Sequence, residues 1–428
     1  MTIMKNSNVK WIGEIPSDWK TAKVSYLCDK IFAGGTPDTT KLEFWDGNIP
    51  WLPSGSCKNK CINSYEKTIT DLGYRNSSTK SIPKNTTLIA MTGATCSNVG
   101  YTTFETCANQ SVTAFVTKED SLFSKYLFYS LIALRDEILS YQMGGAQAGI
   151  NVQDCKNIII TLPPLEVQKS IANFLDKKCS EIDSLSADIQ SQIDVLEEYK
   201  KSVITQAVTK GLNPDVEMKD SGIKWIGMIP KHWDLKPLKY SFTITSGSTP
   251  DSTIQDFWDG DVLWITPADF KTDDYYTSGG RRNISKLGYQ SCSTNMIPSN
   301  SIIFSKRAPI GSVVINSVPL CTNQGCLACI PNTKLNVKFY YFVMSVYDEI
   351  FNLFGSGTTF KEISATIFGN MHFAEPTLEE QQEIVDFLNT KCAEIDAVIV
   401  DKKAQLGTLA EYKKSLIYEY VTGKKEVE

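Results

Sequence analysis

The longest regular pattern of apolar residues in the chain repeats every seven positions. Its members are Leu175, Ile182, Ile189, Leu196 and Val203, with Ile171, Leu185 and Tyr199 three or four positions away. Such a stripe is typical of a helix that buries one face. Gly211 and Pro214 then favour a helix end. The pattern predicts one helix over residues 165–210, roughly 65 Å long at 1.5 Å per residue.

A second stripe of the same kind lies near the end of the chain and stops at Gly423. Its members are Leu388, Ile395, Lys402, Leu409 and Leu416, with Ile384, Val398 and Tyr412 alongside. Polar residues that interrupt the two stripes, and that mark where pairing is weak or register is fixed, are Lys178, Gln192, Lys391 and Gln405. Two such stripes in one chain predict a coiled coil.

Outside the stripes the apolar residues fall in short runs bounded by Gly, Pro, Asn and Ser, which is typical of strands. These runs read NTTLIAMTG, SVTAFVT and NIIITLP, and later NSIIFSK, GCLACIP and IFGNMHF. Helical patterns interrupt them at 124–140 and 337–353. The sequence therefore predicts two mixed α and β domains, each followed by a long helix.

The chain is a tandem repeat with a period of about 213 residues, far longer than that of a solenoid. FWDG occurs at Phe44 and Phe257, and EYKKS occurs at Glu198 and Glu411. The phrase KWIGEIPSDW from Lys10 returns as KWIGMIPKHW. Its Trp, Ile and Pro residues suit packing at the start of each domain. The helical segments match closely between the copies and the globular segments match only at landmarks, so the domains perform two versions of one task. A pseudo-two-fold arrangement of the copies makes the paired helices antiparallel.

Charge is distributed unevenly along the chain, whose net charge is -5. Residues 1–160 and 224–374 each carry a net charge of +2, whereas 161–223 carry -4 and 375–428 carry -5. A mildly basic domain is compatible with binding phosphates, and an acidic helix is suited to a protein partner.

Several classes of function lack support in the sequence. The 12 cysteines are scattered and only two histidines occur, so we expect reduced thiols and no metal site. Cys321, Cys326 and Cys329 have a spacing that can hold an iron–sulfur cluster, but their flanks favour buried strand positions. We find no phosphate-binding GxxxxGK[ST] motif. No run of about 18 apolar residues predicts a membrane span, so we expect a cytoplasmic protein.

The ordered, repeated motifs resemble the specificity (S) subunits of type I restriction-modification systems over essentially the whole chain. The resemblance is carried by the KWIG phrases, GGTPDTT and GSTPDST, the two FWDG segments, SKRAPIG, TNQG, and the helix openings PLEVQKSIANFLD and LEEQQEIVDFLN. It implies an α+β fold in which two target recognition domains are separated by two long helices that form an antiparallel coiled coil.

The resemblance also implies the domain boundaries. We expect the first target recognition domain at 1–160, the first spacer helix at 161–212, a linker at 213–223, the second target recognition domain at 224–374 and the second spacer helix at 375–428.

The function implied by the resemblance is that of a noncatalytic reader of double-stranded DNA with a bipartite, asymmetric target. Two methyltransferase (M) subunits and two restriction (R) subunits are its implied partners. S-adenosylmethionine, ATP and Mg are implied as cofactors of those partners and not of this chain. On B-DNA, half-sites on one face lie about 34–36 Å apart per turn, a distance that helices of the expected length can span.

Candidate DNA-binding residues are polar or basic side chains in loops of the two domains, because Arg, Asn and Gln read bases and Lys, Ser and Thr hold phosphates. In the first domain they are Ser54, Ser56, Lys58, Asn59, Lys60, Arg75, Thr92 and Asn98. In the second they are Lys271, Arg281, Arg282, Lys306 and Arg307.

Candidate residues for helix pairing or for contact with an M subunit lie on the two stripes. They are Gln168, Ile171, Leu175, Ile182, Leu185, Ile189 and Leu196, and Gln381, Ile384, Leu388, Ile395 and Leu409. Two alternatives stay open: a coiled-coil scaffold that does not bind DNA, and a reader fused to a nuclease. The second is disfavoured because the sequence has no carboxylate cluster.

Overall fold

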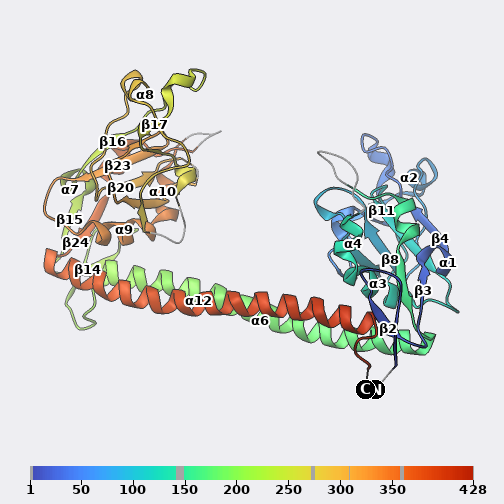
Figure 1. Ribbon diagram of the computed structural model, residues 1–428. Coiled ribbons are helices and arrows are strands. Elements are labelled where there is room, and N and C mark those ends of the chain that lie inside the picture. The colour runs from blue at the N-terminus through green and yellow to red at the C-terminus, as the bar shows by residue number, and fades with distance from the viewer. Residues whose placement is uncertain (1–2, 141–148, 271–274, 308, 357–360, 428) are drawn as a thin grey trace. The chain divides into compact units, whose positions relative to one another are not determined.

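The computed structural model describes residues 3–140, 149–270, 275–307, 309–356 and 361–427 of the chain. The structure divides into two compact units, Met1–Gln190 with Lys403–Glu428, and Ser191–Lys402. Each unit holds one globular domain and one end of each of the two long helices (Figure 1).

The globular domain of the first unit is built on a five-stranded sheet in the order β4-β11-β8-β9-β6. These strands are β4 (Cys28–Ala33), β11 (Val112–Thr117), β8 (Thr86–Ala90), β9 (Val99–Thr102) and β6 (Lys60–Ile62). A smaller sheet contains β10 (Cys107–Ala108), β5 (Trp45–Leu52) and β7 (Lys67–Ile69). Two antiparallel pairs complete it, β1 (Met4–Asn6) with β2 (Glu14–Pro16), and β12 (Ile159–Leu162) with β3 (Lys20–Lys23).

The second unit repeats this plan with the order β16-β23-β20-β21-β19. Its strands are β16 (Phe242–Ser246), β23 (Cys326–Pro331), β20 (Ile302–Ser305), β21 (Val313–Asn316) and β19 (Tyr276–Thr277). The smaller pairs are β18 (Trp264–Ile265) with β22 (Cys321–Thr322), β13 (Met218–Asp220) with β14 (Met228–Pro230), and β15 (Asp234–Pro237) with β24 (His372–Glu375); β17 is Trp258–Val262. In both units the outermost pairing, β6 with β9 and β19 with β21, is parallel.

Short helices cover the sheets and connect the strands. In the first unit they are α1 (Val24–Leu27), α2 (Asp71–Arg75), α3 (Ser124–Ala133), α4 (Arg135–Ser140) and α5 (Val152–Asn157). In the second they are α7 (Leu238–Ser241), α8 (Lys286–Ser291), α9 (Val337–Ser345), α10 (Asp348–Phe354) and α11 (Ala365–Asn370). Each of the two helical patterns predicted in the domains is therefore two helices and not one.

The strand predicted from IFGNMHF is wrong over most of its length. Its first residues belong to α11, and only His372 and Phe373 enter β24. Ser364 explains the difference, because its side chain caps α11 by accepting a hydrogen bond from the Ile367 N–H. A capped helix begins there although the residues after it are strand-like.

The two long helices have the predicted lengths and ends. Helix α6 spans Leu165–Lys210 and α12 spans Leu378–Val421. Gly211 and Gly423 follow them with φ of 74° and 70°, a conformation that glycine adopts without strain. Within the described part of the chain, no helix has the length and apolar content needed to cross a membrane.

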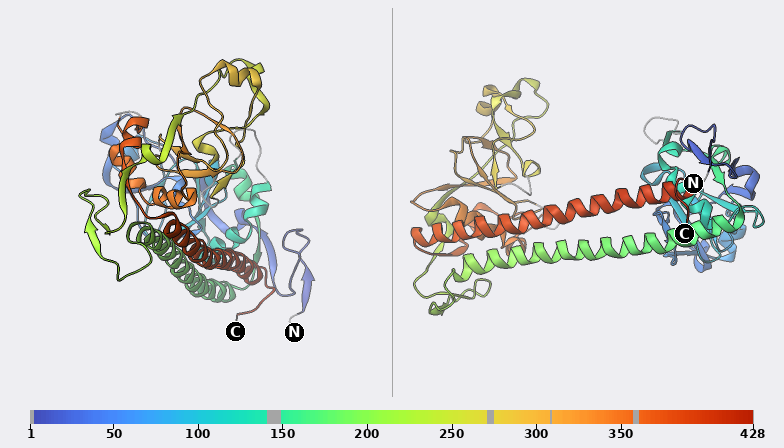
Figure 2. Two further views of the ribbon diagram at one scale, coloured as in Figure 1. Left: turned by 90° about the vertical axis from the view of Figure 1, so that its left-hand side faces the viewer. Right: turned by 60° about the horizontal axis from the view of Figure 1, so that its bottom comes forward.

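Segments of α6 and α12 lie side by side and antiparallel within each unit (Figures 1 and 2). In the first unit Phe174 packs against Tyr420, with ring centroids 4.5 Å apart, and Asp183 pairs with Lys413. In the second, Lys200 pairs with Asp396. Residue numbers thus rise along α6 as they fall along α12, and the predicted antiparallel coiled coil is confirmed.

Only one of the two predicted rows of the helix seam is correct. Leu175, Ile182 and Ile189 are buried as expected. In the other predicted row Ile171 is buried against the domain, but Leu185 and Tyr199 are 48% and 56% exposed. The second buried row lies one residue further on, at Ala172, Cys179 and Ile193. Burial then alternates in steps of three and four residues, as a coiled-coil seam requires. This row, which also contains Lys200, was missed because Cys179 and Lys200 look unsuited to a seam.

The same correction holds in α12, where Val385, Cys392 and Ile399 are buried while Val398 and Tyr412 are exposed. Lys178, Gln192, Lys391 and Gln405 therefore flank the seam and do not interrupt it, and Gln192 accepts a hydrogen bond from Lys402 across the helix pair.

Two equivalent ion pairs connect α6 and α12 at the observed seam. Lys200 Nζ is 2.7 Å from Asp396 Oδ1, and Lys413 Nζ is 2.6 Å from Asp183 Oδ1. Each residue of one pair lies 213 positions from its counterpart in the other. Because these side chains are partly exposed, each pair stabilises by about 1 kcal/mol or less. Their main effect is to specify direction and register, as polar residues in a seam commonly do.

The repeated phrase near the start of each domain forms core, as predicted. Ile12, Ile15 and Trp19 are buried in the first unit, and Ile229 and Trp233 in the second. The end of a long helix packs directly on them: a Cβ on Gly423 would lie 2.4 Å from Pro16, and one on Gly211 would lie 3.3 Å from Trp233. In each unit, the phrase therefore packs against the end of a long helix.

Substitutions to Ala at Ile193 and Leu185 distinguish the observed seam from the predicted one. We expect Ile193→Ala to destabilise the chain by about 2–4 kcal/mol, because it opens a cavity in the seam. Leu185→Ala removes a similar side chain from an exposed position and should change stability by about 0.5 kcal/mol or less. Denaturation in urea followed by circular dichroism measures both, and equal effects would contradict the assigned rows.

Candidate nucleic-acid interface

The segments GGTPDTT and GSTPDST, with the FWDG segments that follow them, build the same turn in both units. Trp45 and Trp51 pack edge to face with centroids 5.1 Å apart, and Trp258 and Trp264 do so at 5.4 Å. Trp45 Nε1 donates to the Asp38 carbonyl at 3.2 Å, and Trp258 Nε1 donates to the Asp251 carbonyl at 3.1 Å. The repeated residues thus fix a framework and are not a variable reading surface.

Glycine is required in this framework at one position of each copy. A Cβ on Gly34 would lie 2.0 Å from the Ala108 carbonyl oxygen, and one on Gly247 would lie 2.0 Å from that of Thr322. The backbone of the turn therefore approaches the strand before NQ more closely than any other residue allows.

Most candidate residues of the first domain lie in two neighbouring segments. Ser54 and Ser56 lie in a single turn of 3-10 helix, η2 (Ser54–Ser56), and Asn59 fixes the next residues to β9. Its side-chain oxygen accepts a hydrogen bond from the Val99 N–H at 2.8 Å. Thr92 and Asn98 lie in the turn between β8 and β9, so the structure brings these segments together. Arg75 is apart from them, at the exposed end of α2.

Lys58 and Lys60 line a pocket of about 570 Å³ that also contains residues of α3, α6 and α12. Asp176 lies in this pocket, where it accepts a hydrogen bond from the Tyr129 hydroxyl at 2.6 Å and pairs with Lys125 at 2.5 Å. Burial, and then the Asp176 carboxylate, raise the pKa of Tyr129, so its hydroxyl stays a donor. The two lysines therefore sit between the domain and its helices.

Each described candidate arginine of the second domain is held by a carboxylate. Arg281 Nε donates to Asp269 at 2.9 Å, and Arg282 Nε donates to Asp259 at 3.1 Å. Arg282 also stacks on Trp258, with 4.2 Å to the ring centroid. Another candidate of the second domain, Lys271, lies outside the described residues.

Asp269 is a fixed acceptor for Arg281. Its carboxylate also accepts hydrogen bonds from the Thr266 N–H and hydroxyl, both at 2.8 Å. Burial acts to raise the pKa of Asp269, but the hydrogen bonds from Arg281 and Thr266 outweigh it and hold the pKa below its usual value. The carboxylate is therefore charged at neutral pH and orients Arg281.

Lys306 and Arg307 share one carboxylate, that of Glu362. Lys306 Nζ lies 2.8 Å from Glu362 Oε1, and Arg307 Nε lies 2.7 Å from Oε2. The backbones also pair, because Arg307 and Glu362 form an isolated β-bridge and the Ile363 N–H donates to the Lys306 carbonyl at 3.0 Å. The loop before α11 therefore supports the turn after β20.

The first domain has the same backbone contact with different side chains. Thr92 forms an isolated β-bridge with Gly149, and the Ile150 N–H donates to the Met91 carbonyl at 2.9 Å. Met91, Thr92 and Gly149 occupy the places of Lys306, Arg307 and Glu362. One scaffold thus presents two charges and a carboxylate in one copy, and an uncharged turn in the other.

The carboxylates of Asp259, Asp269 and Glu362 were missed from the sequence, because the candidates were chosen among basic and uncharged polar side chains. A signal for Glu362 was present in the repeat: it lies 213 positions after Gly149, where the other copy has no side chain. A charged residue opposite a glycine in a tandem repeat indicates a difference in function.

The candidate residues of the helices have three separate environments. Those buried in the seam or against a domain are Ile171, Leu175, Ile182, Ile189, Ile384, Leu388 and Ile395. Leu196 and Leu409 are half-buried, and Leu185 is exposed.

Gln168 and Gln381 are buried and bonded within their own units. Gln168 accepts a hydrogen bond from the Phe123 N–H at 2.9 Å and donates to the carbonyls of Ser121 and Pro163. Gln381 accepts from the Asn336 N–H at 2.9 Å and donates to the Pro376 carbonyl. These amides connect the start of each long helix to its domain.

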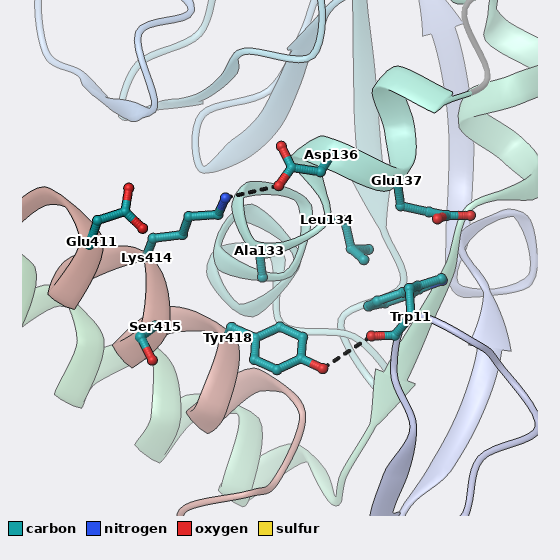
Figure 3. Close-up of a pocket in the computed structure, with 9 residues that line it drawn as sticks. All are labelled: Trp11, Ala133, Leu134, Asp136, Glu137, Glu411, Lys414, Ser415 and Tyr418. Carbon is teal, nitrogen blue, oxygen red and sulfur yellow. Dashed lines mark hydrogen bonds and ion pairs between the residues drawn. The ribbon is translucent and has the colours of Figure 1, made fainter.

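A groove borders the repeated EYKKS segment in each unit, although only the groove of the first unit is also lined by residues of the domain. Figure 3 shows the one in the first unit, of about 510 Å³, where Lys414 pairs with Asp136 at 2.8 Å and the Tyr418 hydroxyl donates to the Trp11 carbonyl. In the second unit a groove of about 450 Å³ is lined by Glu198, Lys201 and Ser202. These residues lie 213 positions before Glu411, Lys414 and Ser415. The repeated EYKKS segment therefore borders a groove in each unit.

Cys321, Cys326 and Cys329 are buried in three different hydrophobic clusters. Burial raises the pKa of Cys321 to about 11 and raises those of Cys326 and Cys329 further. Over the described ranges, no group of three or more His, Cys, Asp and Glu side chains is placed to hold a metal ion. The three thiols act as small core residues.

Comparison with known families gives a match over most of the chain. The family model described as type I restriction modification DNA specificity domain matches residues 16–195 and again 230–406. The two matches correspond to the two copies of the repeat.

Comparison with individual proteins gives relatives of similar description. The specificity subunit of the type I restriction enzyme MjaIX of Methanocaldococcus jannaschii is 35% identical over 194 residues, which cover 45% of this chain and 43% of that protein. The putative MjaX specificity subunit of the same organism is 30% identical over 65% of this chain and 62% of its own length. The MjaVIII specificity subunit is 26% identical over 99% and 97%. The chain thus spans less than two thirds of the first two relatives.

Solved structures share the fold at low identity. A chain from a study of complex assembly and conformational transition of the type I R-M system has a TM-score of 0.75 at 17% identity, over 96% of this chain and 99% of that one. The HsdS subunit of Thermoanaerobacter tengcongensis has a TM-score of 0.51 at 16% identity, over 96% and 98%.

Replacing Gln168 tests whether its amide holds the helix to the domain or serves a partner. We expect Gln168→Leu to destabilise the isolated chain by about 1–3 kcal/mol, because it leaves the Phe123 N–H buried without its acceptor. Glu166→Gln, at a neighbouring exposed position, is the control and should have almost no effect. Thermal melting measures both. A normal melting temperature for Gln168→Leu would contradict the assigned role.

Proposed function

Because this chain belongs to the type I restriction modification DNA specificity domain family, we propose that it is the noncatalytic subunit that reads DNA for a type I restriction-modification complex. The observation that carries the proposal is the pair of equivalent turns at Thr92 and Arg307. Each turn makes the same type of backbone bridge within its own domain, but the two turns carry different side chains. A reader of a bipartite, asymmetric target needs this combination of one scaffold with two surfaces.

Each domain would contact one half of the target. In the first, the surface comprises the segments around Asn59 and Asn98, joined through β9. In the second, it comprises the oriented arginines Arg281, Arg282 and Arg307, with Lys306. Arginine suits guanine, and Asn suits adenine. The two domains therefore carry different reading chemistry, which agrees with an asymmetric target.

The long helices would bind two copies of the M subunit. Among the exposed apolar residues of the two helices, Leu185 and Tyr412 in the first unit match Val398 and Tyr199 in the second at the repeat spacing of 213. Beside each pair lies the same ion pair, Lys178–Glu181 or Lys391–Glu394. An exposed surface repeated in both units is suited to a partner that is present twice.

Catalysis would take place in the partner subunits. On this proposal, the M subunits transfer a methyl group from S-adenosylmethionine to adenine, and two R subunits use ATP and Mg to cut DNA. The contribution of this chain is to place those subunits on the target sequence. It follows that substitutions in its reading turns should change which DNA is modified, and not the rate constant of methyl transfer.

Salt dependence of DNA binding distinguishes a DNA reader from a protein scaffold. For the complex with its cognate M subunit, we expect the logarithm of the affinity to fall linearly with the logarithm of salt concentration, with a slope of about -0.9 per phosphate contacted. Fluorescence anisotropy measures it. DNA with the sequence that adenine-methylation mapping identifies should bind at least about 10³-fold more tightly than scrambled DNA. A complex that forms normally but binds without regard to sequence or salt would favour the scaffold.

Truncating the repeated tyrosines tests the docking of the M subunits. We expect the double variant Tyr199→Ala/Tyr412→Ala to weaken association with the cognate M subunit by at least about tenfold, because an interface tyrosine often contributes about 2 kcal/mol or more. Isothermal titration calorimetry measures it. The control is Val195→Ala/Val400→Ala, since these valines are 60% and 64% exposed but their counterparts in the repeat are Thr408 and Ala187. Equal losses in both double variants would argue against the assigned surface.

A further inference from the structure

We propose that Arg307 reads a guanine in the half-site of the second domain, and that Glu362 is the positioning residue that orients it. This inference rests on the function proposed above and adds the identity of a base and a residue that sets it. It is carried by the geometry of Lys306, Arg307 and Glu362, by the chemistry of the guanidinium group, and by the contrast with the first domain.

Glu362 holds Arg307 from one side only. In the part of the chain that the structure describes, the Arg307 side chain makes its hydrogen bond through Nε, 2.7 Å from Glu362 Oε2. A guanidinium group has five N–H donors in a plane, four of them on the two terminal nitrogens. Over the described residues no protein acceptor bonds the two terminal nitrogens of Arg307, and the side chain is 46% exposed.

The carboxylate itself is firmly placed. Its other oxygen lies 2.8 Å from Lys306 Nζ, and the Lys306 side chain is only 13% exposed. The backbone bridge between Arg307 and Glu362 limits movement of both residues. Burial acts to raise the pKa of Glu362, but hydrogen bonds and charges from Lys306 and Arg307 outweigh it and hold the pKa below its usual value. Glu362 is therefore a charged, fixed acceptor at neutral pH.

A terminal guanidinium edge selects guanine among the four bases. In the major groove, guanine presents two acceptors, N7 and O6, at the spacing of two parallel N–H donors. Adenine presents one acceptor and one donor, so its amino group would face an N–H of Arg307. The three charged side chains sum to +1, which leaves the turn attractive to DNA.

The other arginines of the second domain are less free to read a base in this way. Arg281 also donates from Nη2 to the Ala268 carbonyl at 3.3 Å. Arg282 donates from both Nε and Nη2 to Asp259 and stacks on Trp258. Their terminal edges are partly used within the domain. Among the three, Arg307 best meets the requirement for bidentate contact.

The equivalent turn of the first domain lacks all three charged groups, because it has Met91, Thr92 and Gly149 there. A threonine can contact more than one base and does not select guanine. The two half-sites should therefore differ at the position that this turn reaches. The half-site read by the second domain requires guanine there, whereas Thr92 does not require guanine in the half-site read by the first domain.

Substitution of guanine by 7-deazaguanine tests the contact, because it removes the N7 acceptor and keeps base pairing. The protein used is the full chain in complex with its cognate M subunit, and the DNA carries the sequence found by methylation mapping, with one guanine replaced at a time. For the unaltered complex we expect one position in one half-site where the replacement weakens binding about 5- to 100-fold. Arg307→Ala should abolish that loss at that position alone.

Glu362→Gln separates positioning from mere stability. We expect it to reduce the 7-deazaguanine loss at the same position by at least about threefold, with an unchanged melting temperature of the complex. Thr92→Ala and the charge control Lys334→Ala should leave the loss unchanged. If Arg307→Ala keeps the full loss at every position, or if Glu362→Gln alters only the melting temperature, the inference is wrong. A complex that binds no DNA specifically would overturn the proposed function as well, whereas specific binding without the guanine loss would overturn this inference alone.

Discussion

The antiparallel seam between α6 and α12 is the constraint on which the rest of each unit depends. Its apolar rows supply most of the stabilisation, and the pairs Lys413–Asp183 and Lys200–Asp396 specify direction. A parallel arrangement would leave these partly exposed charges without partners and would lose the small stabilisation that each pair provides. Because the helices run in opposite directions, each unit contains the start of one helix and the end of the other.

This arrangement explains why the chain repeats its opening phrase. In the first unit the start of α6 is held by Gln168, and the end of α12 is held by Tyr126, whose hydroxyl donates to the Val421 carbonyl at 2.9 Å. Gly423 then packs against Pro16 of the phrase. In the second unit the end of α6 packs on Trp233. In each unit the repeated phrase packs against the end of a long helix. Both copies therefore need the same apolar residues there, whatever each domain binds.

Much of the fold could be predicted from the sequence because it depends on periodic burial. The bounds of α6 and the β-rich texture of the domains follow from such patterns, and the antiparallel pairing follows from the tandem repeat. The second row of the seam could not be predicted, because Leu185 looks more suited to a seam than Cys179. One heptad row leaves open on which side its companion lies. Only the tertiary contacts of Asp183 and Lys413 decide between the two.

The candidate site was harder to predict for a different physical reason. Arg307 and Lys306 could be named as candidates because basic side chains suit DNA, but the carboxylate that orients Arg307 comes from Glu362, 55 residues later. Contacts over such distances depend on the bridge between two loops, which has no periodic signal. The repeat alone offered a clue, since Glu362 stands where the first copy has Gly149. Differences between the copies identify the site better than their similarities do.

On the proposed function Glu362 lies close to DNA, and a carboxylate there needs a physical justification because it repels phosphates. Glu362 is neutralised locally by Lys306, so the turn keeps the charge of Arg307 toward DNA. In return, the carboxylate restricts a side chain that otherwise loses about 2 kcal/mol of rotamer entropy when it is fixed. Affinity gained from an unrestrained arginine would be spread over many orientations and many sequences. A restrained arginine gives up some attraction to the backbone and gains discrimination between bases, and discrimination is what a specificity subunit must supply.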